Sequence, residues 1–403
     1  MTSTAIAALA TILGLVVTVL LLVLVAFPLV QTLWSLRAAR RSPPLSLTGG
    51  SRPRIALLVP AHDEAIGLPS TLSSLLPQLA TGDRLVVIAD NCSDQTAVVA
   101  RALGAEAVER FDTTLRGKGY ALDHGLQHLR ADPPDVVLMF DADCIAAPDC
   151  VRILVDEALA SRRPVQARYL IRASDDGAKA RISEFAYRLR SWVRPLGMRR
   201  AGMPCQLMGC GMAFHWSLLE HLSLASGHLT EDMLLGITLA RRGLYPGFCN
   251  EAIVDSRFVA NAADAVVQRT RWEHGALATI FAELPSLLVR SARTLDLRLF
   301  MMALDLAVPP LALLSSLVLM GGIVAVIVAL LGGPVWPFAA FVVALCMQVA
   351  MVVIVQRSYA RDLIRLREIF FEVPLYLMCK VPVYVRFIFK RQVEWVRTKR
   401  DVG

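Results

Sequence analysis

Charge is missing from three long stretches of the sequence, although charged residues make up 19% of its 403 residues. Residues 5–30 and 306–331 lack charge over 26 positions each, and residues 335–355 lack it over 21. A helix needs about 20 apolar residues to cross a bilayer, so each stretch is long enough. The hydrophobic content of 55% also excludes an ordinary soluble protein. We therefore predict three membrane-spanning helices.

The flanks of these stretches predict how the chain is inserted. The first stretch has no basic residue before it, and its apolar run is about twice that of a signal peptide, so we interpret it as an uncleaved anchor. Basic residues collect in cytoplasmic loops, which predicts a multi-pass protein of the bacterial inner membrane with residues 33–300 and the tail in the cytoplasm. The flanking arginines are Arg37, Arg40 and Arg41 after the first stretch and Arg357, Arg361, Arg365 and Arg367 after the third.

Patterns typical of several other functions are also missing. The eight cysteines form no CxxC pair, which excludes the usual zinc spacings and leaves them as small buried side chains. No glycine-rich phosphate loop follows the early apolar runs, which excludes P-loop and dinucleotide-binding proteins. No basic run is interleaved with aromatic residues. We therefore assign the net charge of +8 to the membrane flanks and expect no nucleic-acid partner.

Short apolar runs alternate with helical patterns in the first part of the predicted cytoplasmic region. This order predicts a parallel, doubly wound α/β sheet. Kinases, phosphatases, dehydrogenases and sugar transferases all use such sheets, so the fold alone does not give the function. The predicted strands are 54–60, 84–90, 105–110 and 135–140, and the predicted helices lie near 66–80, from about 94, and around Leu122, Leu126 and Leu129.

Two aspartates, Asp141 and Asp143, directly follow the last predicted strand. Side chains alternate along a strand, so residues two apart should point the same way. Carboxylates that close repel each other unless a cation lies between them, and their oxygens suit Mg²⁺ or Mn²⁺. A helix cap beside a loop carboxylate remains an alternative. A phosphatase is disfavoured because Ile145 stands where its aspartyl-phosphate chemistry needs a hydroxyl residue.

Two later motifs accompany the aspartate pair. Glu231 and Asp232 precede a predicted helix, where carboxylates also favour the helix dipole. In the segment QRTRW, Gln268, Arg271 and Trp272 fall at i, i+3 and i+4 and share one helix face. An aromatic ring, a guanidinium and an amide side by side suit a sugar and a diphosphate. Placement at a membrane interface is the other interpretation of this face.

The order D-x-D, E-D and Q-x-x-R-W between predicted spans resembles the membrane-bound branch of the family 2 glycosyltransferases. That branch includes cellulose, hyaluronan, chitin-oligosaccharide and poly-N-acetylglucosamine synthases. The resemblance covers residues 54–275 and the tail. It implies a GT-A fold, a UDP-sugar donor, Mg²⁺ or Mn²⁺, and inverting transfer that forms a β-glycosidic bond. The implied acceptor is a lipid-linked saccharide or a growing exopolysaccharide, and the implied partners are membrane lipids and other exopolysaccharide assembly proteins.

Two alternatives to a transferase that adds a limited number of sugars stay open. One is a processive synthase that extends and extrudes its polymer. The other is a non-catalytic membrane scaffold with a degenerate transferase domain, which the intact motifs disfavour. The sequence departs from the family pattern at Asp63, where asparagine is usual, and at Ala89, where the first of two aspartates is usual. The segment MGCGMAF at 208–214 resembles the small-residue stretch beside the acceptor.

The resemblance assigns a role to each matching residue. Asp232 would be the general base, Asp143 the direct metal ligand, and Asp141 its partner at the metal. The donor-binding residues would be Pro60, Glu64, Asp90, Lys118, Asp141, Asp143 and Arg271, the acceptor-binding residues Gln268, Trp272 and Glu231, and the gating-loop residues Trp395, Thr398 and Arg400.

Two further segments predict helices at the membrane surface. Residues 181–194 carry an apolar stripe opposite three arginines, which is typical of a basic interfacial helix. Residues 369–389 contain charges and two prolines within an apolar stretch, which predicts an interfacial or re-entrant segment rather than a fourth span. For the first segment, packing on the sheet is the alternative. The predicted domains are an anchor (1–33), a linker (34–53), a GT-A domain (54–258), the QxxRW and interfacial helices (259–300), two membrane helices (301–356), and an interfacial helix with a gating-loop-like tail (357–403).

Overall fold

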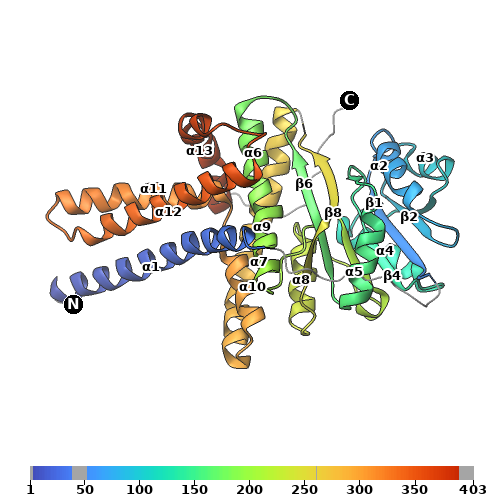
Figure 1. The fold of residues 1–403 in the computed structure, drawn as a ribbon, viewed down its shortest axis with the longest axis horizontal. Coiled ribbons are helices and arrows are strands. Elements are labelled where there is room, and N and C mark those ends of the chain that lie inside the picture. The colour runs from blue at the N-terminus through green and yellow to red at the C-terminus, as the bar shows by residue number, and fades with distance from the viewer. Residues whose placement is uncertain (1–2, 39–51, 260, 390–403) are drawn as a thin grey trace.

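The computed structural model describes residues 3–38, 52–259 and 261–389 (Figure 1). Its centre is an eight-stranded sheet with the order β3-β2-β1-β4-β7-β6-β8-β5. The strands are β1 (Ile55–Ala61), β2 (Arg84–Asp90), β3 (Glu106–Arg110), β4 (Val136–Met139), β5 (Ile145–Ala146), β6 (Val165–Arg172), β7 (Met212–His215) and β8 (Gly247–Arg257).

The first four strands are parallel, as predicted. The apolar runs of β1, β2 and β4 are continuous because these strands are buried on both faces, whereas the edge strand β3 is partly exposed. Alternate residues enter different cores: Leu57 lies in one cluster and the adjacent Leu58 lies in the other. The helices that connect these strands are α2 (Leu68–Leu75), a short 3₁₀ turn (Leu76–Gln78), α3 (Thr96–Ala102) and α4 (Lys118–Leu129).

Beyond β4 the prediction of a purely parallel sheet is wrong. Strand β7 runs antiparallel to both β4 and β6, β6 is parallel to β8, and β5 is antiparallel to β8. The later strands β6 and β8 mix polar and apolar residues and alternate between buried and partly exposed positions along part of their length. The result is a central mixed sheet.

The remaining helices of the globular part surround the sheet. Segment 181–194 packs its stripe, including Ile182, Phe185 and Leu189, against residues 351–376. Arg188 is buried in ion pairs with Glu184 and Asp362, so the prediction of a basic surface helix is wrong. The helices are α5 (Cys150–Ser161), α6 (Ala178–Arg188), the π-helical turn η2 (Leu189–Val193), α7 (Arg194–Arg200), α8 (Glu231–Ala240), α9 (Ala262–Thr294) and α10 (Leu297–Ala307), with a 3₁₀ turn at Trp216–Leu218.

Four helices in the described part of the chain are long and apolar enough to span a membrane. Three match the predicted stretches: α1 (Ser3–Ser35), α11 (Leu311–Leu330) and α12 (Trp336–Tyr359). The fourth lies in α9, which the sequence analysis had not counted. Figure 1 shows α1, α11 and α12 projecting together away from the sheet, whereas α9 runs across their direction. The inner face of α9 packs on α8 and α10.

The last described helix, α13 (Leu366–Phe389), continues through both of its prolines. Tyr376, Leu377 and Lys380 on one side are buried. Large apolar side chains are exposed on the other side, as an interfacial helix requires. They are Phe371, Leu375, Met378, Val381, Val385 and Phe389.

Helix α1 is locked to the globular part at its carboxyl end. Arg194 Nη2 lies 2.7 Å from Asp305 Oδ1, and its Nε donates to Gln31 Oε1 at 2.9 Å. Gln31 in turn donates to Asp305 Oδ1 at 2.6 Å. A Cβ atom at Gly197 would lie 2.0 Å from the Gln31 carbonyl oxygen, so glycine permits α7 and α1 to meet backbone to backbone. These contacts join α1, α7 and α10.

Candidate active site

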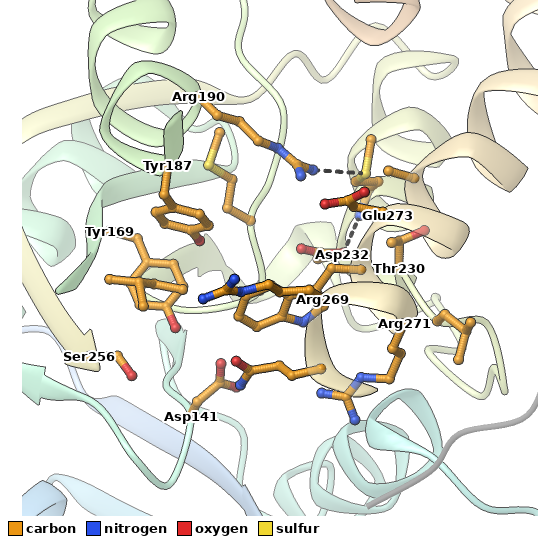
Figure 2. Close-up of a pocket in the computed structure, with 18 of the residues that line it drawn as sticks. Asp141, Tyr169, Tyr187, Arg190, Thr230, Asp232, Ser256, Arg269, Arg271 and Glu273 are labelled. Carbon is orange, nitrogen blue, oxygen red and sulfur yellow. Dashed lines mark hydrogen bonds between the residues drawn. The ribbon is translucent and has the colours of Figure 1, made fainter. Parts of the chain in front are cut away.

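A cavity of about 380 Å³ opens where the parallel strands end (Figure 2). Ligands of open α/β sheets bind at this edge. Every predicted site residue in the described part of the chain lines this cavity, whereas Trp395, Thr398 and Arg400 lie outside the described residues. The lining residues predicted from sequence are Pro60, Glu64, Asp90, Lys118, Asp141, Asp143, Glu231, Asp232, Gln268, Arg271 and Trp272.

Lys118 is the cation at the centre of the polar part of the cavity. It begins α4, forms an ion pair with Asp141, and donates to the Gly209 carbonyl at 2.8 Å. Glu231 lies 3.8 Å away. Burial disfavours the charged lysine, but the carboxylates of Asp141 and Glu231 outweigh it and hold the pKa of Lys118 above its ordinary value. The ammonium therefore stays charged near neutral pH.

The aspartate pair is arranged differently from the prediction. Strand β4 ends at Met139, so strand alternation does not govern the two residues. Asp141 faces Lys118, whereas Asp143 Oδ2 accepts a hydrogen bond from Ser256 Oγ on β8 at 3.1 Å. Both carboxylates nonetheless line the same cavity. Two hard oxygen donors at one cavity fit Mg²⁺ or Mn²⁺.

Glu231 and Asp232 form the first turn of α8, as predicted. Asp232 Oδ1 accepts the Met233 backbone N–H at 2.8 Å. Burial raises the pKa of both carboxyl groups, and it brings Glu231, with a side chain 17% exposed, to a pKa of about 7. A carboxylate with a raised pKa is a stronger base, which suits proton removal from a hydroxyl group.

The QRTRW face of α9 closes the cavity from the other side. Gln268 is only 4% exposed, and its Oε1 accepts no hydrogen bond from the residues that the structure describes. A buried acceptor of this kind is costly unless a ligand supplies a donor. The Trp272 ring lies 6.3 Å from both the Tyr187 and Phe258 rings, so an aromatic wall adjoins the two carboxylates of α8.

Asp90 and Glu273 have charged partners that sequence reasoning did not foresee. Asp90, at the end of β2, accepts a hydrogen bond from Arg110 Nη1 at 2.6 Å. Glu273, next to Trp272, forms a buried ion pair with Lys380 of α13. Helix α13 is thereby held against the helix that carries QRTRW.

Several lining residues were missed by the sequence analysis. They include Tyr169, Tyr187, Arg190 and Ser256, which Figure 2 labels among the residues around the cavity. Tyr187 and Arg190 belong to the segment 181–194, whose amphipathic pattern predicted a membrane surface instead. Their alignment with the cavity depends on how that segment packs, and no local pattern encodes it.

The arrangement of sheet and cavity is that of a GT-A glycosyltransferase. The same fold occurs in the mannosyltransferase PcManGT from Pyrobaculum calidifontis, solved with GDP-Man and Mn²⁺, at a TM-score of 0.55 and 16% identity over 93% of this chain and 99% of that one. Residues 53–275, more than half of the chain, match the family model "Glycosyltransferase like family 2". The chain therefore belongs to glycosyltransferase family 2 and is a glycosyltransferase.

Two curated relatives are similar to about half of the chain. The probable glycosyltransferase YdaM of Bacillus subtilis is 24% identical over 238 residues, which are 55% of each protein. The O-antigen chain rhamnosyltransferase RfbN of Salmonella typhimurium is 24% identical over 210 residues, which are 50% of this chain and 65% of that protein. The chain thus spans less than two thirds of either relative.

Proposed function

We propose that the protein is an inverting, membrane-bound glycosyltransferase. It transfers a sugar from a UDP-sugar to a lipid-linked saccharide or growing exopolysaccharide on the cytoplasmic side of the inner membrane. The observation that carries this proposal is the meeting of the Asp141–Lys118 pair, Asp232 and the QRTRW face at one cavity. The resemblance to the cellulose, hyaluronan and chitin-oligosaccharide synthases supports the UDP-sugar and the β-linkage.

In the proposed mechanism Asp232 removes the proton from the acceptor hydroxyl group. The oxygen of that hydroxyl group attacks the anomeric carbon of the donor sugar at the same time. The carbon–UDP bond breaks on the opposite face, so an α-linked donor gives a β-linked product. Lys118 and Arg271 line the cavity as cations that balance charge on the departing diphosphate. Trp272 stacks on the acceptor sugar, and Gln268 and Glu231 bind its hydroxyl groups.

Asp141 and Asp143 would hold the Mg²⁺ or Mn²⁺ ion. The ion supplies positive charge to the leaving diphosphate. Mn²⁺ in PcManGT, a protein of the same fold, supports this assignment. Asp143 is already oriented by Ser256, which keeps its carboxylate directed at the cavity.

The exposed apolar side chains of α1, α11 and α12 support insertion in a membrane. In the most apolar 18-residue stretch of each helix, the buried share of the residues is only 22% for α1, 17% for α11 and 28% for α12. These three helices also pack on one another through a small cluster of buried residues. The exposed apolar face of α13 adds a contact at the membrane surface. The arginine flanks support a cytoplasmic catalytic domain.

Membranes containing the full chain, incubated with a panel of labelled UDP-sugars, test the proposal. We expect one UDP-sugar to give a labelled product, and membranes with Asp232→Asn to give none. Product size separates limited addition from processive synthesis. Transfer from GDP- or dTDP-sugars but from no UDP-sugar would contradict the donor assignment.

A further inference from the structure

The cavity does not end at the proposed reaction centre. It continues to the ends of α1 and α11 nearest the catalytic domain, where its lining becomes apolar. This part is formed by Pro28, Val308, Pro309, Pro310, Leu311 and Leu314. Pro28 lies two turns before the end of α1, and Leu311 and Leu314 lie in the first turn of α11. The cavity therefore connects the carboxylates of α8 with two candidate spans.

Arg190 is one of the cations that line this cavity. It lies on the π-helical turn η2, a form of helix that is often found at functional sites. Its Nη2 is 3.7 Å from the Met233 sulfur, a weak acceptor, and it forms no ion pair with the residues that the structure describes. Its neighbours Arg188 and Arg194 each have carboxylate partners.

The position of Arg190 along the cavity follows from its place in the chain, on η2 and just before α7. Figure 2 shows the Arg190 guanidinium directed toward the part of the cavity that holds Asp232. Arg194 is one turn further along and bonds Asp305, whose chain neighbours line the apolar end. One helical turn advances about 5 Å. Arg190 therefore lies between the proposed base and the apolar end.

We propose that Arg190 binds the phosphate of a lipid-phosphate acceptor whose hydrocarbon chain leaves between α1 and α11. The guanidinium offers paired N–H donors that match phosphate oxygens. The Pro and Leu side chains at the end of the cavity suit a hydrocarbon chain. This inference rests on the proposed function and selects, among its acceptors, a lipid-linked one. An uncharged polysaccharide has no phosphate that Arg190 could pair with.

Binding of farnesyl phosphate tests the proposal without requiring the natural acceptor. Tryptophan fluorescence of the purified full chain in detergent would report binding of farnesyl phosphate, farnesol and inorganic phosphate. We expect farnesyl phosphate to bind at least about tenfold more tightly than farnesol, because only the phosphate engages Arg190. Inorganic phosphate, which lacks the chain, should bind more weakly than farnesyl phosphate.

Three variants assign the effect to Arg190. Arg190→Gln should remove the preference for farnesyl phosphate, and Arg190→Lys should keep part of it. Arg152→Gln on α5, where the side chain is 63% exposed and lies outside the cavity, should change nothing. UDP binding should be the same in all of them.

Two results would overturn the proposal. Equal binding of farnesyl phosphate and farnesol to the wild type would show that no phosphate site exists, whether or not the glutamine variant folds. Weaker UDP binding by Arg190→Gln with unchanged farnesyl phosphate binding would assign Arg190 to the donor. The proposed function fails by a different measurement, namely when the wild type neither transfers nor hydrolyses any UDP-sugar.

Discussion

The two halves of the sheet supply functional residues in different ways. In the parallel half, Pro60, Asp90 and Asp141 come at or just after the carboxyl ends of strands. In the mixed half the strands mainly support helices, and Asp232 and Trp272 are delivered by α8 and α9. Asp143 joins the halves through Ser256 on β8. We infer that the parallel strand pairing fixes the proposed donor residues, whereas helix packing against α10 and α13 places the proposed acceptor residues.

Substitution of Asp143, which joins the two halves of the sheet, should have the largest effect on sugar transfer. Asp143→Asn should lower transfer by about 10³-fold or more, because a metal ligand and the charge next to the diphosphate are lost together. EDTA should silence the wild type in the same way. Labelled transfer measures both effects, and Asp149→Asn, at an exposed position nearby, serves as the control. Full wild-type activity in EDTA would remove the metal from the mechanism.

A substitution of Asp232 on α8 should lower the rate of the chemical step without weakening donor binding. Asp232→Asn should lower turnover by about 10²-fold or more, since the amide cannot take the acceptor proton. UDP-sugar binding should stay near that of the wild type, because the donor residues of the parallel half are unchanged. Equal losses of binding and turnover would make Asp232 a donor-binding residue.

A substitution of Gly209 should show how closely Asp232 and Lys118 pack around this backbone position. Its φ is +82°, and a Cβ there would lie 3.2 Å from both Asp232 Oδ2 and Lys118 Nζ. Gly209→Ala should therefore lower kcat/KM by between about tenfold and a hundredfold, because it displaces both groups. Gly202→Ala is a matched control: its φ is +74° and no atom lies within 4 Å of the added methyl group. Similar losses in the two variants would point to backbone strain alone.

The pKa of Glu231 predicts a smaller effect that depends on pH. Burial raises this pKa to about 7, so the carboxyl group is protonated below that pH and ionised above it. In the proposed function, ionised Glu231 accepts hydrogen bonds from acceptor hydroxyls, so the acceptor KM should rise up to about tenfold as pH falls from about 8 to about 6. Glu231→Gln, which does not ionise, should flatten this dependence at saturating donor. An unchanged slope would exclude Glu231 as its source.

The tail should have the mildest effect. If residues 395–400 close over the donor, the double variant Trp395→Ala/Thr398→Ala should change kcat and the donor KM together by several-fold. Val396→Ala, within the same segment but outside the pattern, is the control. Unchanged kinetics would leave the tail as a basic segment at the membrane.

Strands β1, β2 and β4 could be predicted because they are buried on both faces and consist mainly of unbroken apolar runs. Strand β8, with Asn250, Glu251 and Asp255, has no such run, and its pairing with β6 joins residues far apart in the sequence. The motif residues could be named from their order, and all those described do meet at one cavity. The orientation of Asp143 toward β8 could not be predicted, because it depends on where β4 ends and on a contact with a distant strand.

The backbone contact at Gly197 bears on how the catalytic domain moves. With no side-chain layer between α7 and α1, the two helices have little room to slide, and the Gln31–Arg194–Asp305 network opposes rotation. Helix α1 and the catalytic domain should then move together as one rigid body. If α1 spans a membrane, as proposed, a domain held in this way keeps its site at a fixed height above the bilayer, and the acceptor has to move to the site.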